Sequence, residues 1–104
     1  MTPQEQRIAI AEACGWKQDT TLPEADFDRW SGPSGVHYFS CPDYLSDINA
    51  MHEAEKILHR VMRSQFIDYL AQQTGIDYFS LAHATAAQRA EAFLRTLGKW
   101  KANQ

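Results

Sequence analysis

The residue types that could bind a metal gather in one helical stretch. His52, Glu55 and His59 follow one another at spacings of three and four, which on a continuous helix would place them along one edge. Imidazole and carboxylate groups are good ligands for zinc or iron. A closed site also needs ligands from another element, and His37 and His83 form no such cluster in the sequence. We therefore favour an ordinary side-chain pair between Glu55 and His59, and we expect no metal or other cofactor.

A nucleophilic hydrolase is the second chemical possibility. Cys41 lies near His37 in the sequence, and such a pair could do covalent catalysis if the two side chains met in space. Such a pair also needs an oriented base, and closeness in the sequence alone does not supply that geometry. No serine lies in a nucleophile elbow. The segment "GPSG" also lacks the lysine and the strand-to-helix context of a phosphate-binding loop.

Aromatic side chains are concentrated in the segment before this helix. Trp30, Tyr38 and Tyr44 fall within fifteen residues, together with Arg29 and the start of the predicted helix. Aromatic rings, arginine and the amide groups of a helix start can together hold a base and its phosphate. The same mixture suits a protein interface or the core of a small domain. The candidate contact residues for a ligand or partner are Trp30, His37, Tyr38, Asp43 and Tyr44.

Length and composition limit the class of protein. The chain has 104 residues, of which 44% are hydrophobic and 22% charged, so we expect one globular domain over residues 1–104. A net charge of −3 argues against a DNA or RNA polymer as the main partner. Two distant cysteines are too few for a disulfide scaffold, which predicts reduced thiols and a cytoplasmic location. We see no apolar run long enough for a membrane span, and no signal peptide.

The first half of the chain predicts one helix and one hairpin. Thr2 and Glu5 form a capping box with Pro3 between them, so a helix should run from Pro3 to Ala13 or Cys14 and end before Gly15. The following segment is rich in turn-forming residues. Within it, residues 26–30 and 36–40 could pair as a short β-hairpin around the Gly-Pro-Ser-Gly turn.

The second half predicts mainly helix. We expect an uninterrupted helix over residues 45–62 with a wide apolar face, capped by Asp43, Ser46 or Asp47. A shorter helix should cover residues 64–75, and residues 76–84 could be a strand or a covering loop. A capping box of Thr85 and Gln88 then opens the last helix, whose apolar stripe consists of Ala86, Ala90, Phe93, Leu97 and Trp100. The predicted fold class is α+β, with three to four helices packed on a small antiparallel sheet or hairpin.

Two of these segments carry a family resemblance. "PDYLSDINAMHEAEKIL", residues 42–58, resembles the opening of the central helix in the phage α-β-α (ABA) sandwich domain family. "HATAAQRAEAFLRTLGKW", residues 83–100, resembles the closing helix of that family. The resemblance implies a small protein of a tailed phage or prophage, with helices packed on a short sheet. It implies no enzymatic activity and no catalytic residues.

The sequence thus favours a non-enzymatic binding module. We expect a phage or prophage accessory protein in the cytoplasm of the host cell, where it would bind a host protein or a small nucleotide-like ligand and so counter host defence. We also expect a homo-oligomer. The alternatives are a small metal- or Cys-dependent hydrolase and a structural protein of phage assembly. This expectation rests partly on analogy with other small phage proteins.

Overall fold

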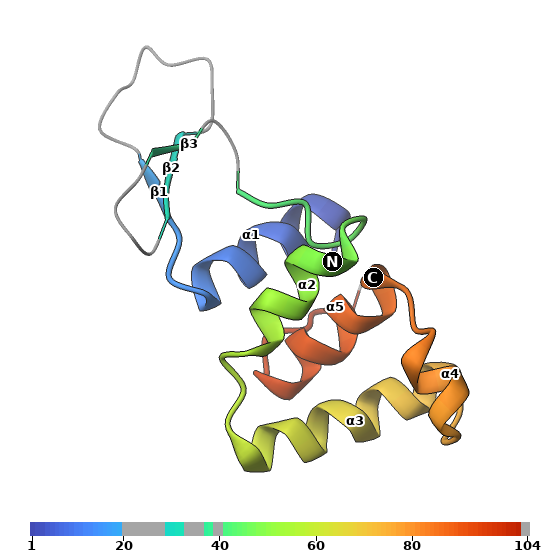
Figure 1. The fold of residues 1–104 in the computed structure, drawn as a ribbon. Coiled ribbons are helices and arrows are strands. Elements are labelled where there is room, and N and C mark those ends of the chain that lie inside the picture. Colours follow the sequence, from blue (N-terminus) through green and yellow to red (C-terminus); the bar gives the residue numbers. More distant parts are fainter. Residues whose placement is uncertain (20–28, 33–36, 39–40, 103–104) are drawn as a thin grey trace.

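Helices make up most of the described chain. Figure 1 shows the computed structural model, which describes residues 1–19, 29–32, 37–38 and 41–102. The elements in chain order are α1 Pro3–Ala13, β1 Lys17–Asp19, β2 Arg29–Ser31, β3 His37–Tyr38, α2 Ile48–Glu55, α3 Arg60–Thr74, α4 Tyr78–Ala82 and α5 Ala86–Thr96.

Helix α5 forms the centre of the fold. It packs against α1, α2 and α3. Ala86, Ala90 and Phe93, which belong to the predicted apolar stripe, are buried, while Leu97 and Trp100 are partly buried against the core. The alanines let neighbouring helices approach closely, and the larger Phe93 fills the space beside them.

The predicted starts of α1 and α5 are confirmed. The Thr2 hydroxyl accepts a hydrogen bond from the Glu5 amide at 3.1 Å, and the Glu5 carboxylate accepts one from the Thr2 amide at 3.3 Å. Thr85 and Gln88 make the same reciprocal pair at 3.1 and 2.9 Å. These bonds satisfy amides that a helix start leaves without intrahelical partners.

The predicted continuous helix over residues 45–62 is wrong. Helix α2 ends at Glu55, and the amides of Ile57 and Leu58 bond back three residues, at 3.2 and 3.1 Å, in a tightened last turn. Helix α3 then begins at Arg60 and continues to Thr74, so it includes the shorter helix expected near its end. One straight helix over residues 48–74 would be about 40 Å long. The break instead buries Leu58 and lets α3 pack along α5.

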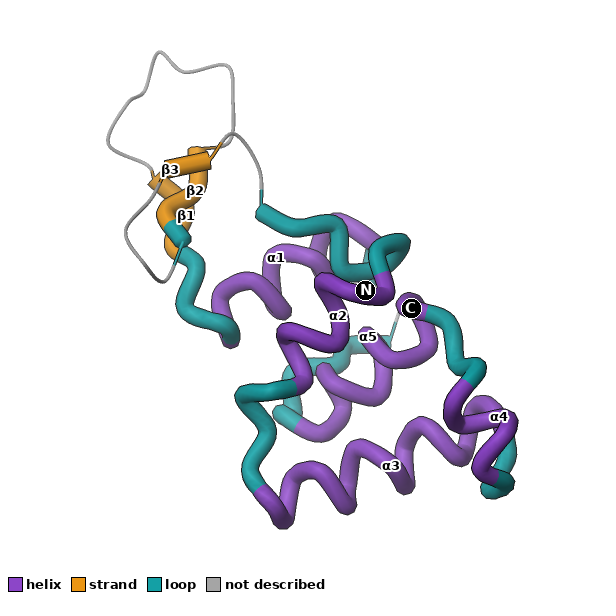
Figure 2. Tube along the Cα trace, viewed as in Figure 1, coloured by secondary structure: helices purple, strands orange, loops and turns teal. Residues whose placement is uncertain are grey.

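The predicted α+β architecture, with helices packed on a sheet, is also wrong. The strands form a small antiparallel sheet in the order β1-β2-β3, and each contributes only two or three residues. Figure 2 shows these strands beyond the C-terminal end of α1, away from α3 and α5. Strands this short offer too little surface to cover a helix face, so the helices bury their apolar sides against one another.

The expected hairpin coincides in part with β2 and β3. Trp30 lies opposite Tyr38, and Ser31 opposite His37. The other strand, β1, was not expected; it pairs with the far edge of β2. The remaining residues of the expected hairpin, 26–28, 36 and 39–40, lie outside the described residues.

The segment expected to be a strand or loop forms a short helix instead. Asp77 caps α4 by accepting a hydrogen bond from the Ser80 amide at 3.0 Å. Gly75, with φ of 112°, ends α3 just before it, as the sequence predicts. Of the helices in the described ranges, none combines the length and the apolar character needed to cross a lipid bilayer.

Candidate functional site

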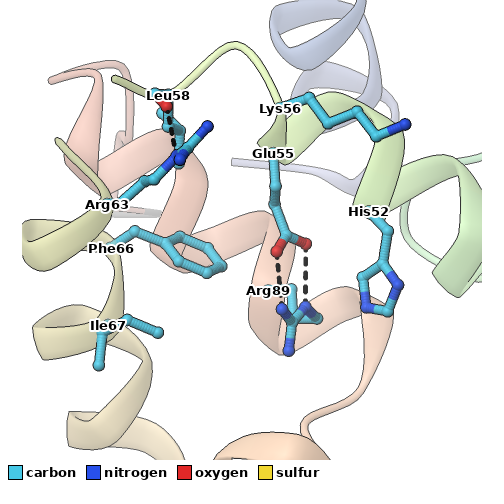
Figure 3. A pocket seen from close by; sticks show the side chains of 8 residues that line it. All are labelled: His52, Glu55, Lys56, Leu58, Arg63, Phe66, Ile67 and Arg89. Carbon is cyan, nitrogen blue, oxygen red and sulfur yellow. Dashed lines mark hydrogen bonds and ion pairs between the residues drawn. The ribbon is translucent and has the colours of Figure 1, made fainter. Parts of the chain in front are cut away.

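A cavity of about 320 Å³ opens between α2, α3 and α5. The end of α2 and the link after it supply one wall, the first two turns of α3 another, and α5 the third (Figure 3). The lining residues are His52, Glu55, Lys56, Leu58, Arg63, Phe66, Ile67 and Arg89. Its volume falls within the range of small-ligand sites, which are typically about 300–1,000 Å³.

The most ordered contact in the cavity is an ion pair between Glu55 and Arg89. The Arg89 Nε donates to one carboxylate oxygen at 2.9 Å, and Nη2 donates to the other at 2.6 Å. Both side chains are only 15% exposed. Figure 3 shows the two groups facing each other across two parallel hydrogen bonds. This bidentate geometry fixes the plane of the guanidinium as well as its position.

Arg89 also lies over an aromatic ring. Its guanidinium carbon is 5.6 Å from the centroid of Phe66, which is buried at the base of the cavity. This distance is typical of a cation–π contact. Leu58 and Ile67 extend the apolar surface on either side. The cavity therefore has an apolar floor with a fixed positive group beside it.

Two further cations lie at the edge of the cavity. Arg63 donates through Nε to the Leu58 carbonyl at 2.7 Å, and among the described residues this is its one hydrogen bond, so its terminal amino groups can bind an added acceptor. Lys56 pairs with Glu53 at 2.8 Å, and both side chains are about 70% exposed, so water screens this pair strongly. Three cations and one carboxylate give the lining a net charge of +2 with His52 neutral, in a chain whose net charge is −3.

The structure separates the candidate metal ligands. His52 is exposed, Glu55 is held by Arg89, and His59 occupies the N-cap position of α3 after the helix break, without a side-chain capping hydrogen bond. The predicted pair of Glu55 with His59 is therefore replaced by the pair with Arg89. Spacings of three and four place side chains on one edge only while the helix continues, and α2 ends at Glu55. Within the described ranges, no three His, Cys, Asp or Glu side chains come close enough to hold a metal ion.

The candidate contact residues of the aromatic segment are not brought together at one exposed surface. Trp30 is 1% exposed and Tyr44 is 3% exposed, so both pack in the core. Asp43 is exposed and accepts a hydrogen bond from the Ser46 hydroxyl, within the turn before α2. His37 and Tyr38 contribute the backbone of β3, and their side chains lie outside the described part of the chain.

Tyr44 borders a second cavity, of about 390 Å³, beside the C-terminal end of α1. Its phenol forms side-chain hydrogen bonds with Cys14 and Trp16, which also line this cavity. Burial is the main cause that raises the pKa of Tyr44, and burial likewise raises the pKa of the Cys14 thiol. Cys41 is buried close to Tyr44, where its backbone carbonyl accepts a hydrogen bond from Arg7. Burial at this cavity thus favours the neutral forms of Tyr44 and Cys14, whereas the lining of the first cavity carries a net positive charge.

Sequence reasoning missed most of the first cavity. In the sequence, Arg89 falls in the predicted last helix, Phe66 in the predicted helix over residues 64–75, and Arg63 between two predicted helices, and nothing marks them as members of one site. Glu55 and Arg89 are 34 residues apart, so no local spacing could have paired them.

Comparison with known proteins adds no relative. No protein-family model, no curated protein and no solved structure matches the chain. The helices-on-sheet architecture that the resemblance implies is not the architecture of the described residues.

Proposed function

We propose that this protein is a non-enzymatic binding module whose ligand is a small anion with a planar ring, such as a nucleotide. The cavity between α2, α3 and α5 is the binding site. One observation carries the proposal: three cations line a cavity with an apolar floor, and the guanidinium of Arg89, held by Glu55, lies over the ring of Phe66.

Each part of a nucleotide has a matching group in this cavity. Arg63 and Lys56 can donate charge-assisted hydrogen bonds to phosphate oxygens. A base can stack on the guanidinium of Arg89 or against the apolar floor, because arginine planes and aromatic rings are both good stacking surfaces. Glu55 keeps Arg89 in that plane and reduces its availability as a second phosphate ligand.

The biological setting of the proposal comes from the resemblance. Residues 42–58 and 83–100 resemble parts of a phage domain family, and they meet at the cavity through Glu55 and Arg89. In that setting the protein acts as a phage or prophage accessory protein in the host cytoplasm. A module that binds a nucleotide without consuming it would lower the concentration of a nucleotide signal and so counter host defence.

The test is a binding titration of the purified chain with chosen nucleotides. Calorimetry with adenine and guanine nucleotides, with cyclic dinucleotides and with inorganic phosphate covers the ligand class. Arg63→Ala should weaken binding about 10-fold to 100-fold, because a charge-assisted hydrogen bond contributes about 1.5–3 kcal/mol. Arg60→Ala is the matched control: it removes the same charge from an exposed position of α3 that does not line the cavity.

The outcomes separate the alternatives. Equal binding by Arg63→Ala and the parent chain would place the ligand elsewhere. Failure of every nucleotide to bind would exclude this ligand class. Chromatography of the nucleotide after long incubation should recover it intact, and hydrolysis would show that the chain is an enzyme.

A further inference from the structure

The corner between α3 and α4 exposes three large apolar side chains within four residues. Ile76 is 88% exposed, Tyr78 92% and Phe79 72%. We call these three residues the α4 corner. Single exposed apolar residues are common, but a contiguous patch of this kind marks an interaction surface. The other face of α4 is turned toward the core, where Leu81 packs.

The backbone of the α4 corner and the ring of Phe79 are held in place by the local structure. Asp77 accepts hydrogen bonds from both the amide and the hydroxyl of Ser80, each at 3.0 Å, which fixes the first turn of α4. Phe79 stacks on His83 one turn later, with ring centroids 4.1 Å apart. A preordered surface loses less conformational entropy when it binds. The turn that carries the corner and the ring of Phe79 are therefore ordered before any partner binds.

The charge of the α4 corner and the area that it exposes together indicate which kind of partner binds it. Among residues 75–86, Asp77 is the one that carries a full charge, so the corner has no charge pattern that would select an oppositely charged partner. The three side chains present on the order of 500 Å². Two copies that covered these side chains completely would hide on the order of 1,000 Å², which is the lower limit for a specific interface.

We infer that the α4 corner is the contact surface of a two-fold homodimer. In such a contact each copy presents the same patch, so Tyr78 and Phe79 of one copy pack on those of the other. Val61, near the start of α3, lies about 20 Å from the corner along the helix. Pairing at the corner leaves the edge of the cavity near Arg63 open, and the inference does not rest on the proposed ligand.

Sedimentation velocity of the full chain over a range of concentrations, without nucleotide, tests the inference. The parent chain should associate to a dimer in the micromolar range. Tyr78→Ser with Phe79→Ser should weaken dimerisation at least 10-fold and leave the helical circular dichroism unchanged, because both side chains lie outside the core. Val61→Ser, which removes an exposed apolar side chain at the other end of α3, should leave the dimer unchanged.

A second variant tests the same contact by adding a charge to it and not by removing apolar area. Ile76→Asp brings two like charges together at the two-fold contact and should also dissociate the dimer. A parent chain that stays monomeric up to several hundred micromolar would overturn the inference. So would a dimer that survives both the double variant and Ile76→Asp, or that Val61→Ser weakens as much as they do.

Discussion

At the residue scale, Arg89 connects three helices. It pairs with Glu55 at the end of α2, lies over Phe66 of α3, and donates to the Leu81 carbonyl of α4 at 3.4 Å. Because the pair with Glu55 is mostly buried, removing either partner leaves a charge that water solvates poorly. The same contacts that shape the cavity therefore also stabilise the fold.

A double-mutant cycle should measure this dual role. Arg89→Ala alone should lower the free energy of unfolding by about 3 kcal/mol, and Glu55→Ala with Arg89→Ala should cost clearly less than the sum of the single changes. Chemical denaturation provides the measurement. The control cycle is Glu53 with Lys56, an exposed pair that should couple by less than about 0.5 kcal/mol. Equal coupling energies in the two cycles would show that burial does not strengthen the ion pair between Glu55 and Arg89.

Tyr44 gives a prediction for alkaline pH. Its pKa is raised above the ordinary value of 10.0, mainly by burial and further by Cys14 and Cys41. The folded state therefore favours the neutral phenol. This contribution to stability is complete below pH 10 and is lost as the pH rises above it. Absorbance at alkaline pH should show one late phenolate transition that coincides with unfolding.

Two phenylalanine variants identify the tyrosine responsible. Tyr44→Phe should remove the late transition, whereas Tyr78→Phe, at a side chain 92% exposed, should leave it unchanged. If all tyrosines of the parent chain ionise together before unfolding, burial does not keep the phenol of Tyr44 neutral in the folded state.

At the element scale, helix starts follow local chemistry. Thr2 with Glu5 and Thr85 with Gln88 cap α1 and α5 as their sequences predict. The interruption after Glu55 has no such local signal, since neither proline nor glycine occurs over residues 56–59. It is stabilised by the burial of Leu58 in the core, and Arg63, five residues further on, donates a hydrogen bond to the Leu58 carbonyl. Periodicity of apolar residues cannot reveal a break of this origin.

The cap of α5 can be tested by substitution. Thr85→Ala removes the acceptor for the Gln88 amide and should cost about 1 kcal/mol of unfolding free energy, while Thr85→Asp should keep most of it. Ser64→Ala, at an exposed position inside α3, is the control and should change stability by less than about 0.5 kcal/mol. A larger effect at Ser64 than at Thr85 would show that the cap contributes little.

At the scale of the whole molecule, the helices pack around α5, and the small sheet takes little part in that packing. The segment with the most aromatic residues predicted a contact surface, yet Trp30 and Tyr44 are buried. Conversely, the aromatic residues that the described chain exposes are Tyr78 and Phe79. They lie in the segment for which the sequence left strand and loop open. An aromatic residue suits a core and an interface equally well by its chemistry.

The sequence alone determined what depends on neighbours along the chain: the capping boxes, the end of α3 at Gly75 and the part of the apolar stripe that lies within α5. These interactions span four residues or fewer. Tertiary structure decided the break after Glu55, the partner of that carboxylate, the burial of Trp30 and the separation of the sheet from the helices. Each of these depends on where a distant segment packs. Their stability comes from the burial of apolar side chains from segments far apart in the sequence, and the spacing of neighbouring residues does not reveal which segments meet.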